Sequence, residues 1–386
     1  MLFHTAQYLL FIVWLLACAS CATGKLHLNQ PVDVYKTSEH PDFTLYALGD
    51  AGAFNEQSKS VIKSLAAETA DDMQPGAVIY LGDNVYPAGL APEENAVEHL
   101  HGQEILLNQI TPLVNYNRDI LFIPGNHDWN SSKPGGLDAM KRQGDFIKSL
   151  NNSKIKLIPQ QGCGDPQAIA LTPKTTMILF DSEWWIQDWE KEPDMNKGCS
   201  IQSRAEFMSA FKKLVQENKD KQLIISMHHP LYSQGTHGGY FPWRDHIFPM
   251  TRVVDWLYVP LPVIGSIYPL YRNLFGHSQD TQHPNYRSLK DQILSHVAGI
   301  EDVVFLSGHD HNMQYTRRDG NHHLISGAGS KQNRVSNSRD LIYGHMAPGF
   351  MQLDVFEQLG VRLTIYEVEV ETGDSKEVYS DFIIKK

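Results

Sequence analysis

Short apolar runs alternate with longer amphipathic stretches along most of the chain. Strand-like runs are predicted at residues 43–48, 77–81, 120–123, 155–158, 176–180, 223–226 and 303–306. Helical patterns are predicted at about 56–70, 92–114, 137–150 and 204–217. Strands of the buried type that alternate with helices are typical of α/β folds with largely parallel sheets.

The C-terminal part of the chain has a different pattern. Three strand-like runs follow one another there with no helical pattern between them, at residues 350–356, 361–369 and 378–384. Strands joined in this way pair antiparallel. We therefore expect antiparallel strands over about 349–385, added to the parallel part of the fold.

A long apolar insertion, about residues 240–285, separates two of the strand-like runs. Its part from Phe241 to Phe275 is rich in Trp, Tyr, Pro and large aliphatic residues. Two interpretations stay open. The segment packs on the domain as a loop, or it forms a lid or a surface patch that faces a membrane or a partner.

The N-terminus carries an apolar run of 15 residues, Tyr8 to Ala22. Since about 20 residues are needed to span a bilayer, this run is predicted to be an export signal within a leader of residues 1–22. Small residues before a Cys resemble the lipidation site of a bacterial lipoprotein, with Cys21 as the preferred residue and Cys18 as the alternative. An uncleaved anchor helix is the other interpretation.

Both interpretations predict an exported protein of the cell envelope, periplasmic or on the surface, held at a membrane by an N-terminal lipid or anchor. Residues 23–41 are polar, contain two prolines, and are predicted to form a tether. Beyond the leader only Cys163 and Cys199 remain. An even pair in an exported protein predicts one disulfide, with two unpaired thiols as the alternative.

The composition and net charge of the chain limit the kinds of partner that it is expected to bind. With 42% hydrophobic residues the chain can bury a large core, and residues 42–386 are predicted to form one domain. The formal net charge of -11 should repel the phosphates of nucleic acid, so a nucleic-acid partner is not expected. The sequence names no protein partner.

Five short polar motifs, each placed after an apolar run, carry the candidate chemistry. They are Gly49-Asp50-Ala51-Gly52, Gly82-Asp83-Asn84-Val85-Tyr86, Gly125-Asn126-His127-Asp128, Ile225-Ser226-Met227-His228 and Gly308-His309-Asp310-His311. Ligands gather at the carboxyl ends of strands in α/β folds, where these motifs lie. Carboxylate, amide, phenol and imidazole ligands without a thiolate suit two oxygen-loving or borderline metal ions rather than a structural zinc site.

The motifs, in this order, resemble those of the metallophosphoesterase superfamily, specifically the purple acid phosphatases. The chain departs from their pattern at Ile225, where Val is usual. The resemblance implies a four-layer αββα sandwich with mixed sheets. It also implies a metal-dependent phosphoric ester hydrolase, an acid phosphatase that acts on small phosphomonoesters.

The resemblance implies a binuclear centre of Fe(III) and a divalent iron, zinc or manganese ion. It assigns the ferric ion to Asp50, Asp83, Tyr86 and His311. It assigns the divalent ion to Asp83, Asn126, His228 and His309, so that Asp83 would bridge the two. A tyrosine in the second motif, with Gly52 in place of a histidine in the first, favours this branch of the superfamily.

Three further residues are candidates for catalysis. By the resemblance, His127 contacts phosphate and helps to protonate the leaving group, and Asp128 could orient its ring. His237 stands nine positions after His228, where a second substrate histidine is expected. His229 is a fallback metal ligand.

Two other functions stay open. One is a phosphodiesterase or nucleotide hydrolase with two manganese or two zinc ions on the same scaffold. The other is a non-catalytic envelope protein that binds a partner. Loss of catalysis usually relaxes at least one ligand position, and none is degenerate here.

Overall fold

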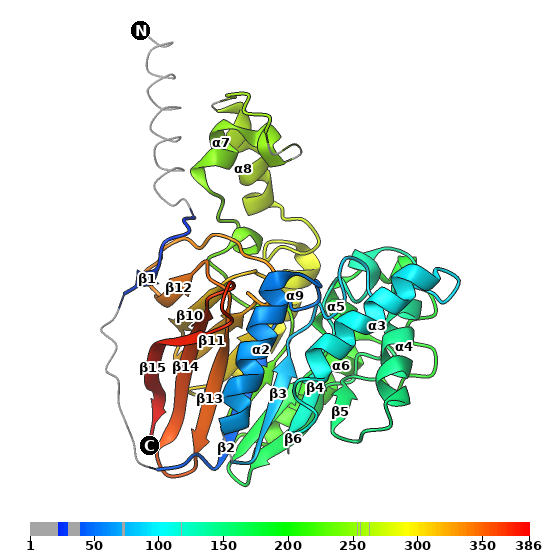
Figure 1. Ribbon diagram of the computed structural model, residues 1–386, viewed down its shortest axis with the longest axis vertical. Coiled ribbons are helices and arrows are strands. Elements are labelled where there is room, and N and C mark those ends of the chain that lie inside the picture. The colour runs from blue at the N-terminus through cyan, green and yellow to red at the C-terminus, as the bar shows by residue number, and fades with distance from the viewer. Residues whose placement is uncertain are drawn as a thin grey trace.

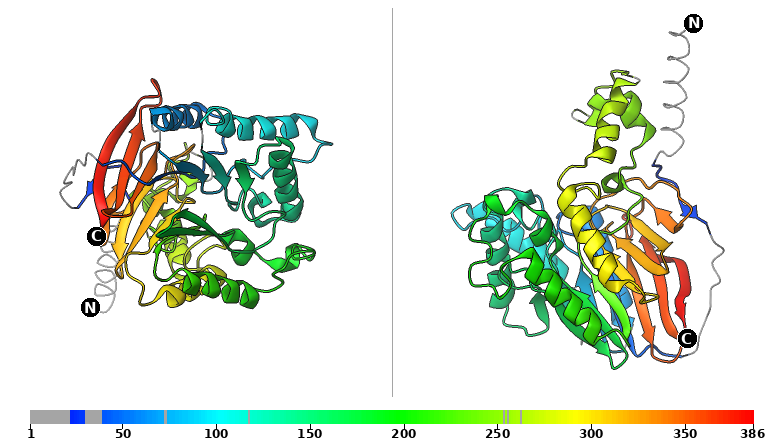
Figure 2. Two further views of the ribbon diagram at one scale, coloured as in Figure 1. Left: turned by 90° about the horizontal axis from the view of Figure 1, so that it is seen from below. Right: turned by 180° about the vertical axis from the view of Figure 1, so that it is seen from behind.

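The computed structural model describes residues 22–29, 39–71, 74–116, 118–252, 254, 256–261 and 263–386. Two mixed β-sheets lie face to face, and helices cover both outer faces (Figure 1; Figure 2, left). The predicted leader with Cys18 and Cys21, and residues 30–38 of the predicted tether, lie outside the described residues.

The first sheet has seven strands in the order β15-β14-β13-β2-β3-β4-β5. Its parallel half consists of β2 (Phe43–Leu48), β3 (Gly76–Tyr80), β4 (Asp119–Phe122) and β5 (Ile155–Leu157). Its antiparallel half consists of β13 (Gly349–Phe356), β14 (Gly360–Val368) and β15 (Ser375–Lys385). The three C-terminal strands therefore pair antiparallel, as the sequence predicts.

The second sheet has eight strands in the order β1-β12-β10-β11-β9-β8-β7-β6. Its parallel centre consists of β7 (Thr175–Leu179), β8 (Gln222–Ser226), β9 (Val304–Ser307) and β11 (Asn321–Ser326). Antiparallel strands complete it on both sides: β6 (Gln167–Thr172), β10 (Met313–Arg318), β12 (Leu341–His345) and β1 (His27–Leu28).

Successive side chains of a strand point to opposite faces of its sheet, and this alternation explains how the sheets and helices form layers. In β2, Leu45 and Ala47 face the second sheet, whereas Tyr46 and Leu48 face the helices. On the outer side of the first sheet lie α2 (Glu56–Asp71), α3 (Ala96–Ile110) and α4 (Gly136–Ser149). On the outer side of the second lie α5 (Ser182–Ile186), α6 (Arg204–Glu217) and α9 (Pro284–Val297). The central strands β2, β3, β8 and β9 are buried on two faces, which confirms the predicted four-layer sandwich.

The N-terminal segment of the described chain runs along an edge of the second sheet. Within the stretch predicted as a tether, Thr23 pairs with Val335 and β1 pairs with β12. The Ala22 amide donates a hydrogen bond to the Phe241 carbonyl at 3.3 Å. The first described residue, Ala22, therefore lies at the start of the apolar insertion.

The insertion projects beyond both sheets, at the end of the molecule where β1 and β12 lie (Figures 1 and 2). It contains α7 (Trp243–Ile247) and α8 (Ile267–Leu274), joined by short 3-10 turns. The Thr281 amide donates to the His237 carbonyl at 3.0 Å and closes its base. Among the described residues, no helix is both long and apolar enough to cross a bilayer.

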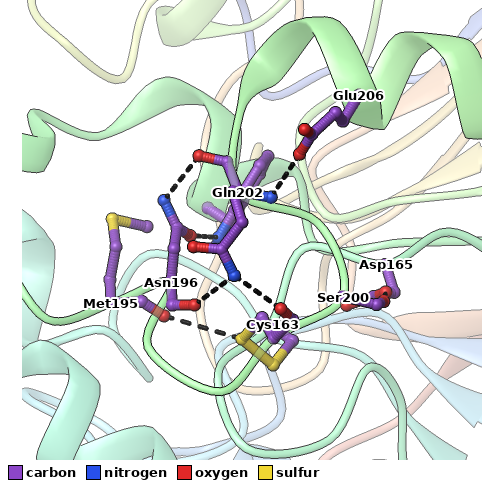
Figure 3. Close-up of a disulfide and its surroundings, with 9 residues drawn as sticks. Cys163, Asp165, Met195, Asn196, Ser200, Gln202 and Glu206 are labelled. Atoms are coloured by element: carbon purple, nitrogen blue, oxygen red, sulfur yellow. Dashed lines mark hydrogen bonds between the residues drawn. A yellow bond between two sulfur atoms is a disulfide. The ribbon is translucent and has the colours of Figure 1, made fainter.

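A disulfide joins Cys163 to Cys199, with the two Cα atoms 5.5 Å apart (Figure 3). It ties the loop before β6 to the loop between α5 and α6. The Gln202 side chain donates to the carbonyl oxygens of Cys199 and Asn196, which holds the second loop in place. The predicted pairing of the two cysteines is confirmed.

Candidate metal centre

The five motifs converge at one end of the two sheets. Each lies at the end of β2, β3, β4, β8 or β9, or within a few residues after it. Three of their residues, Asp50, Asp83 and His309, have positive φ angles of 58°, 55° and 73°. Residues other than glycine rarely adopt this backbone conformation, and such strain concentrates at functional sites. These three turns lie where the motifs converge, with Asp50 and Asp83 in one cluster of possible metal-binding groups and His309 in the other.

The first group of candidate ligands gathers around the phenol of Tyr86. Its hydroxyl donates to Asp83 Oδ2 at 2.9 Å and to Asp50 Oδ1 at 3.1 Å, and it lies 3.1 Å from His311 Nε2. The second Asp50 oxygen accepts from the His309 amide at 2.8 Å. The other three residues predicted for the ferric ion therefore all lie in contact with the Tyr86 phenol oxygen.

The second group gathers around Asn126. Its Oδ1 lies 3.1 Å from both His228 Nε2 and His309 Nδ1, and these two nitrogens are 3.2 Å apart. The other nitrogens lie near backbone carbonyls, His228 Nδ1 at 2.8 Å from Leu81 and His309 Nε2 at 2.9 Å from Gln279. Such hydrogen bonds fix the tautomer, so the inward nitrogens carry the lone pairs that a cation needs.

Asp83 lies between the two groups. Its Oδ1 accepts from the His127 amide at 2.8 Å and lies 3.5 Å from His228 Nε2. Its Oδ2 is the atom that accepts from Tyr86. One carboxylate oxygen thus points to each group, the arrangement needed to share a ligand between two cations.

The electrostatics of the site fit positive ions. Burial raises the pKa of Asp50 to about 7, and the neighbouring Asp83 carboxylate adds to this effect. Burial, reinforced by the same two carboxylates, raises the pKa of Tyr86 well above its ordinary value. Two buried carboxylates and a phenol repel one another when ionised, and a cation among them reverses that cost.

Glycine is required where the first two motifs touch. A Cβ atom on Gly52 would lie 2.4 Å from the Asp83 carbonyl oxygen. The Gly52 amide donates to that same carbonyl, and its own carbonyl accepts from the Tyr86 amide at 2.9 Å. The residue at position 52 therefore forms the turn that places Tyr86, and a side chain there would displace it.

His127 lies beside these groups, but Asp128 does not orient its ring. His127 Nδ1 lies 2.6 Å from the Pro87 carbonyl oxygen and 3.1 Å from Ser131 Oγ. Asp128 instead accepts from the amides of Gly125, Asn84 and Val85. The interpretation of Asp128 as a catalytic orienting residue is wrong, because its buried carboxylate holds the second and third motifs together.

His237 also lies at the site, with its ring centre 4.0 Å from that of His309. Its Nδ1 lies 3.0 Å from Asp280 Oδ1, and Arg272 donates two hydrogen bonds to the same carboxylate. Burial alone would raise the pKa of Asp280, but the bonds from His237 and Arg272 lower it to about 2. The chain Arg272–Asp280–His237 connects α8 to the site, and no sequence motif indicated it.

His229, the fallback ligand, is close to His228 and His309 but lies behind them. These three imidazoles form one cluster of possible metal-binding groups, and Asp50, Asp83 and His311 form another. Both nitrogens of His229 are engaged, Nδ1 at 2.8 Å from Ser182 Oγ and Nε2 at 2.6 Å from Gln279 Oε1. The inward-facing position for a metal ligand is therefore left to His228 and His309, the residues predicted from the sequence.

Lys331 is a residue of the site that the sequence did not single out. Its Nζ lies 3.2 Å from the centre of the Tyr86 ring. Burial lowers the pKa of Lys331, against the pull of Asp83 and Asp50. It places an amino group beside the candidate ligands. No local pattern around residue 331 could have indicated this, because the contact arises from tertiary packing.

A four-layer α/β sandwich with two groups of candidate ligands at its strand ends defines a metallophosphoesterase. The family model of the calcineurin-like phosphoesterases matches residues 43–348, and the chain belongs to that family. It is a hydrolase of the metallophosphoesterase superfamily, whose members use a dinuclear metal site. No curated protein matches the sequence.

Three solved structures share the fold. GAP50, described as the anchor in the inner membrane complex of Plasmodium, is 14% identical with a TM-score of 0.56 and 89% of each chain covered. PhoD is 8% identical with a TM-score of 0.53, over 89% of this chain and 73% of that one. The purple acid phosphatase PPD1 of yellow lupin (Lupinus luteus) is 15% identical with a TM-score of 0.50, over 89% of this chain and 54% of that one.

Proposed function

We propose that the protein is an acid phosphatase that hydrolyses small phosphomonoesters with an Fe(III) ion and a divalent iron, zinc or manganese ion. One observation carries this proposal: the phenol of Tyr86 lies within 3.1 Å of Asp50, Asp83 and His311. A phenol so surrounded would suit a hard trivalent ion as a ligand. In this proposal the ligands are Asp50, Asp83, Tyr86, Asn126, His228, His309 and His311.

When bound, the two ions would polarise the phosphate and activate water for in-line attack. The chain's own residues supply the rest. With its Nδ1–H donated to the Pro87 carbonyl, the His127 ring can act as the general acid only as the imidazolium, whose second proton, on Nε2, would pass to the leaving oxygen. Lys331 and His237 supply positive or donor groups on either side of the ligand groups. Both would hold the phosphate oxygens in position.

A substrate panel tests the proposal. Metal-loaded protein is expected to hydrolyse p-nitrophenyl phosphate faster than bis(p-nitrophenyl) phosphate, with two metal ions per chain. Turnover of the diester alone would favour the phosphodiesterase with two manganese or zinc ions. A folded protein with both ions and no turnover of either compound would favour a non-catalytic binding role in the envelope.

Asp280→Asn is expected to lower kcat/KM for the monoester by about 10- to 100-fold, as loss of a supporting hydrogen-bond partner commonly does. The neutral amide cannot hold both His237 and Arg272 as the carboxylate does. Metal content should stay unchanged, because Asp280 touches none of the proposed ligands through its carboxylate. The matched control is Asp291→Asn, an exposed carboxylate on α9. An Asp280→Asn variant as active as this control would contradict the role of His237.

The same proposal includes an exported, membrane-anchored protein. The apolar leader and the disulfide between Cys163 and Cys199 support it, because disulfides persist in oxidising compartments. Flotation of the full chain with lipid vesicles tests the anchor.

A further inference from the structure

The apolar insertion exposes much more hydrophobic surface than the rest of the protein. Of the described residues, twenty large hydrophobic side chains are exposed, and thirteen of them lie between Trp243 and Phe275. Trp256 is 77% exposed and Trp243 is 55% exposed. A concentration of exposed apolar side chains of this kind marks a site of contact with another phase or molecule.

The α8 helix has its apolar face on the outside. Ile267, Leu270 and Leu274 are each about 60% exposed, at 62%, 58% and 58%. The buried side of the helix instead includes Arg272, which is bonded to Asp280. A surface helix ordinarily turns its polar face to water. The reversed arrangement indicates that the exposed face of α8 contacts something other than water in the functional protein.

The position of the insertion identifies what covers it. The Ala22 amide is hydrogen-bonded to the Phe241 carbonyl, so the chain emerges from the leader at the base of the insertion. A lipid on Cys21 or Cys18 and an uncleaved anchor helix would both end there. Each form of the proposed anchor therefore brings a bilayer beside this surface.

We propose that the insertion is a membrane-docking surface that lies in the interfacial layer of the bilayer holding the N-terminal anchor. This inference rests on the anchored protein proposed above. The 16 positions from Trp256 to Tyr271 contain no charged residue, whereas the whole chain has a net charge of -11. Exposed Trp and Tyr rings, such as those of Trp256, Tyr258 and Tyr271, favour the boundary between headgroups and acyl chains.

The surface lies on the bilayer and does not span it. The α8 helix has 8 residues, and at about 1.5 Å per residue its length is roughly 12 Å, well short of a hydrocarbon core of about 30 Å. Docking at two places, the anchor and the insertion, would fix how the catalytic end faces the membrane. The base of the insertion, which carries His237 and Asp280, lies between the docking surface and the metal centre.

Tryptophan quenching by brominated phosphatidylcholine tests the proposal on the full chain in vesicles. A Trp14→Phe background removes the fluorophore of the leader. The protein is expected to be quenched, and the paired substitution Trp243→Phe and Trp256→Phe is expected to abolish most of the quenching. The remaining tryptophans Trp129, Trp184 and Trp185 are buried in the core, and Trp189 packs against Trp184.

Two charged variants separate this surface from other apolar patches. Ile267→Glu, Leu270→Glu and Leu274→Glu together should abolish the quenching of Trp243 and Trp256. The control places the same substitutions on the exposed face of α3, at Val97, Leu100 and Leu107, and should leave the quenching unchanged. Circular dichroism of both variants verifies that each is folded.

The outcomes distinguish the two proposals. A wild-type chain that does not float with vesicles overturns the anchor, and the docking surface with it. A chain that floats but shows no quenching of Trp243 and Trp256 overturns the docking surface alone. Cross-links between copies through the variant Ile267→Cys, together with absent quenching, would assign the surface to a second copy of the chain instead.

Discussion

Asp83→Asn is expected to abolish phosphomonoester hydrolysis while the protein stays folded. The substitution preserves shape but removes the charge from a side chain whose two oxygens face the two groups of candidate ligands. Altering a residue that merely supports a metal ligand costs about 10- to 100-fold in activity, so loss of a shared ligand should cost more than about 100-fold. Turnover of p-nitrophenyl phosphate and metal content per chain measure the effect.

The matched control is Asp340→Asn, a surface carboxylate whose partner is Arg318 at 3.9 Å. It should retain wild-type turnover and both metal ions. An Asp83→Asn protein with two metal ions and turnover near that of the control would refute the bridging role.

Tyr86→Phe is expected to remove the visible absorption of the iron-loaded protein. In the absence of a cation, burial and the carboxylates of Asp83 and Asp50 raise the pKa of this phenol well above its ordinary value. The phenolate can therefore form at neutral pH only when a cation offsets those charges. Colour should appear as ferric ion is added to the metal-free wild type and should not appear in the variant.

Tyr116→Phe is the control for this experiment, because that tyrosine lies away from the metal centre, on the turn after α3. It should be as coloured as the wild type. A coloured Tyr86→Phe protein would remove the evidence for tyrosinate ligation. An active wild type that carries two metal ions and has no colour would favour the centre with two manganese or zinc ions.

The sequence predicted the parts of the fold that local pattern determines. The helix at Arg204–Glu217 was predicted with the bounds that the structure has, because its amphipathic period is regular. The strand ends that carry the five motifs were predicted from the short apolar runs that precede them. In contrast, α9 and the strands β10 to β12 were missed. Buried polar residues such as His322 and His323 in β11 disguise a strand that is buried on both faces.

Within the site, residue types could be predicted but their partners could not. A motif records which side chains are present, and the fold decides which distant atoms they meet. Asp128 stands next to His127 in sequence, yet it bonds to the backbone of the second motif. Gln279, Asp280 and Lys331 reach the site from segments without any local signature.

Because Arg272 is bonded to Asp280, some parts of the insertion should tolerate substitution less well than others. Arg272 belongs to α8, so excising the whole projection would also strip the support from His237 and confuse two effects. Among its described residues, the tip from about 248 to 263 makes no bond of this kind to the support of His237. Over evolutionary time the tip should therefore need to keep only its apolar character, while the last turn of α8 stays under the same selection as the catalytic groups.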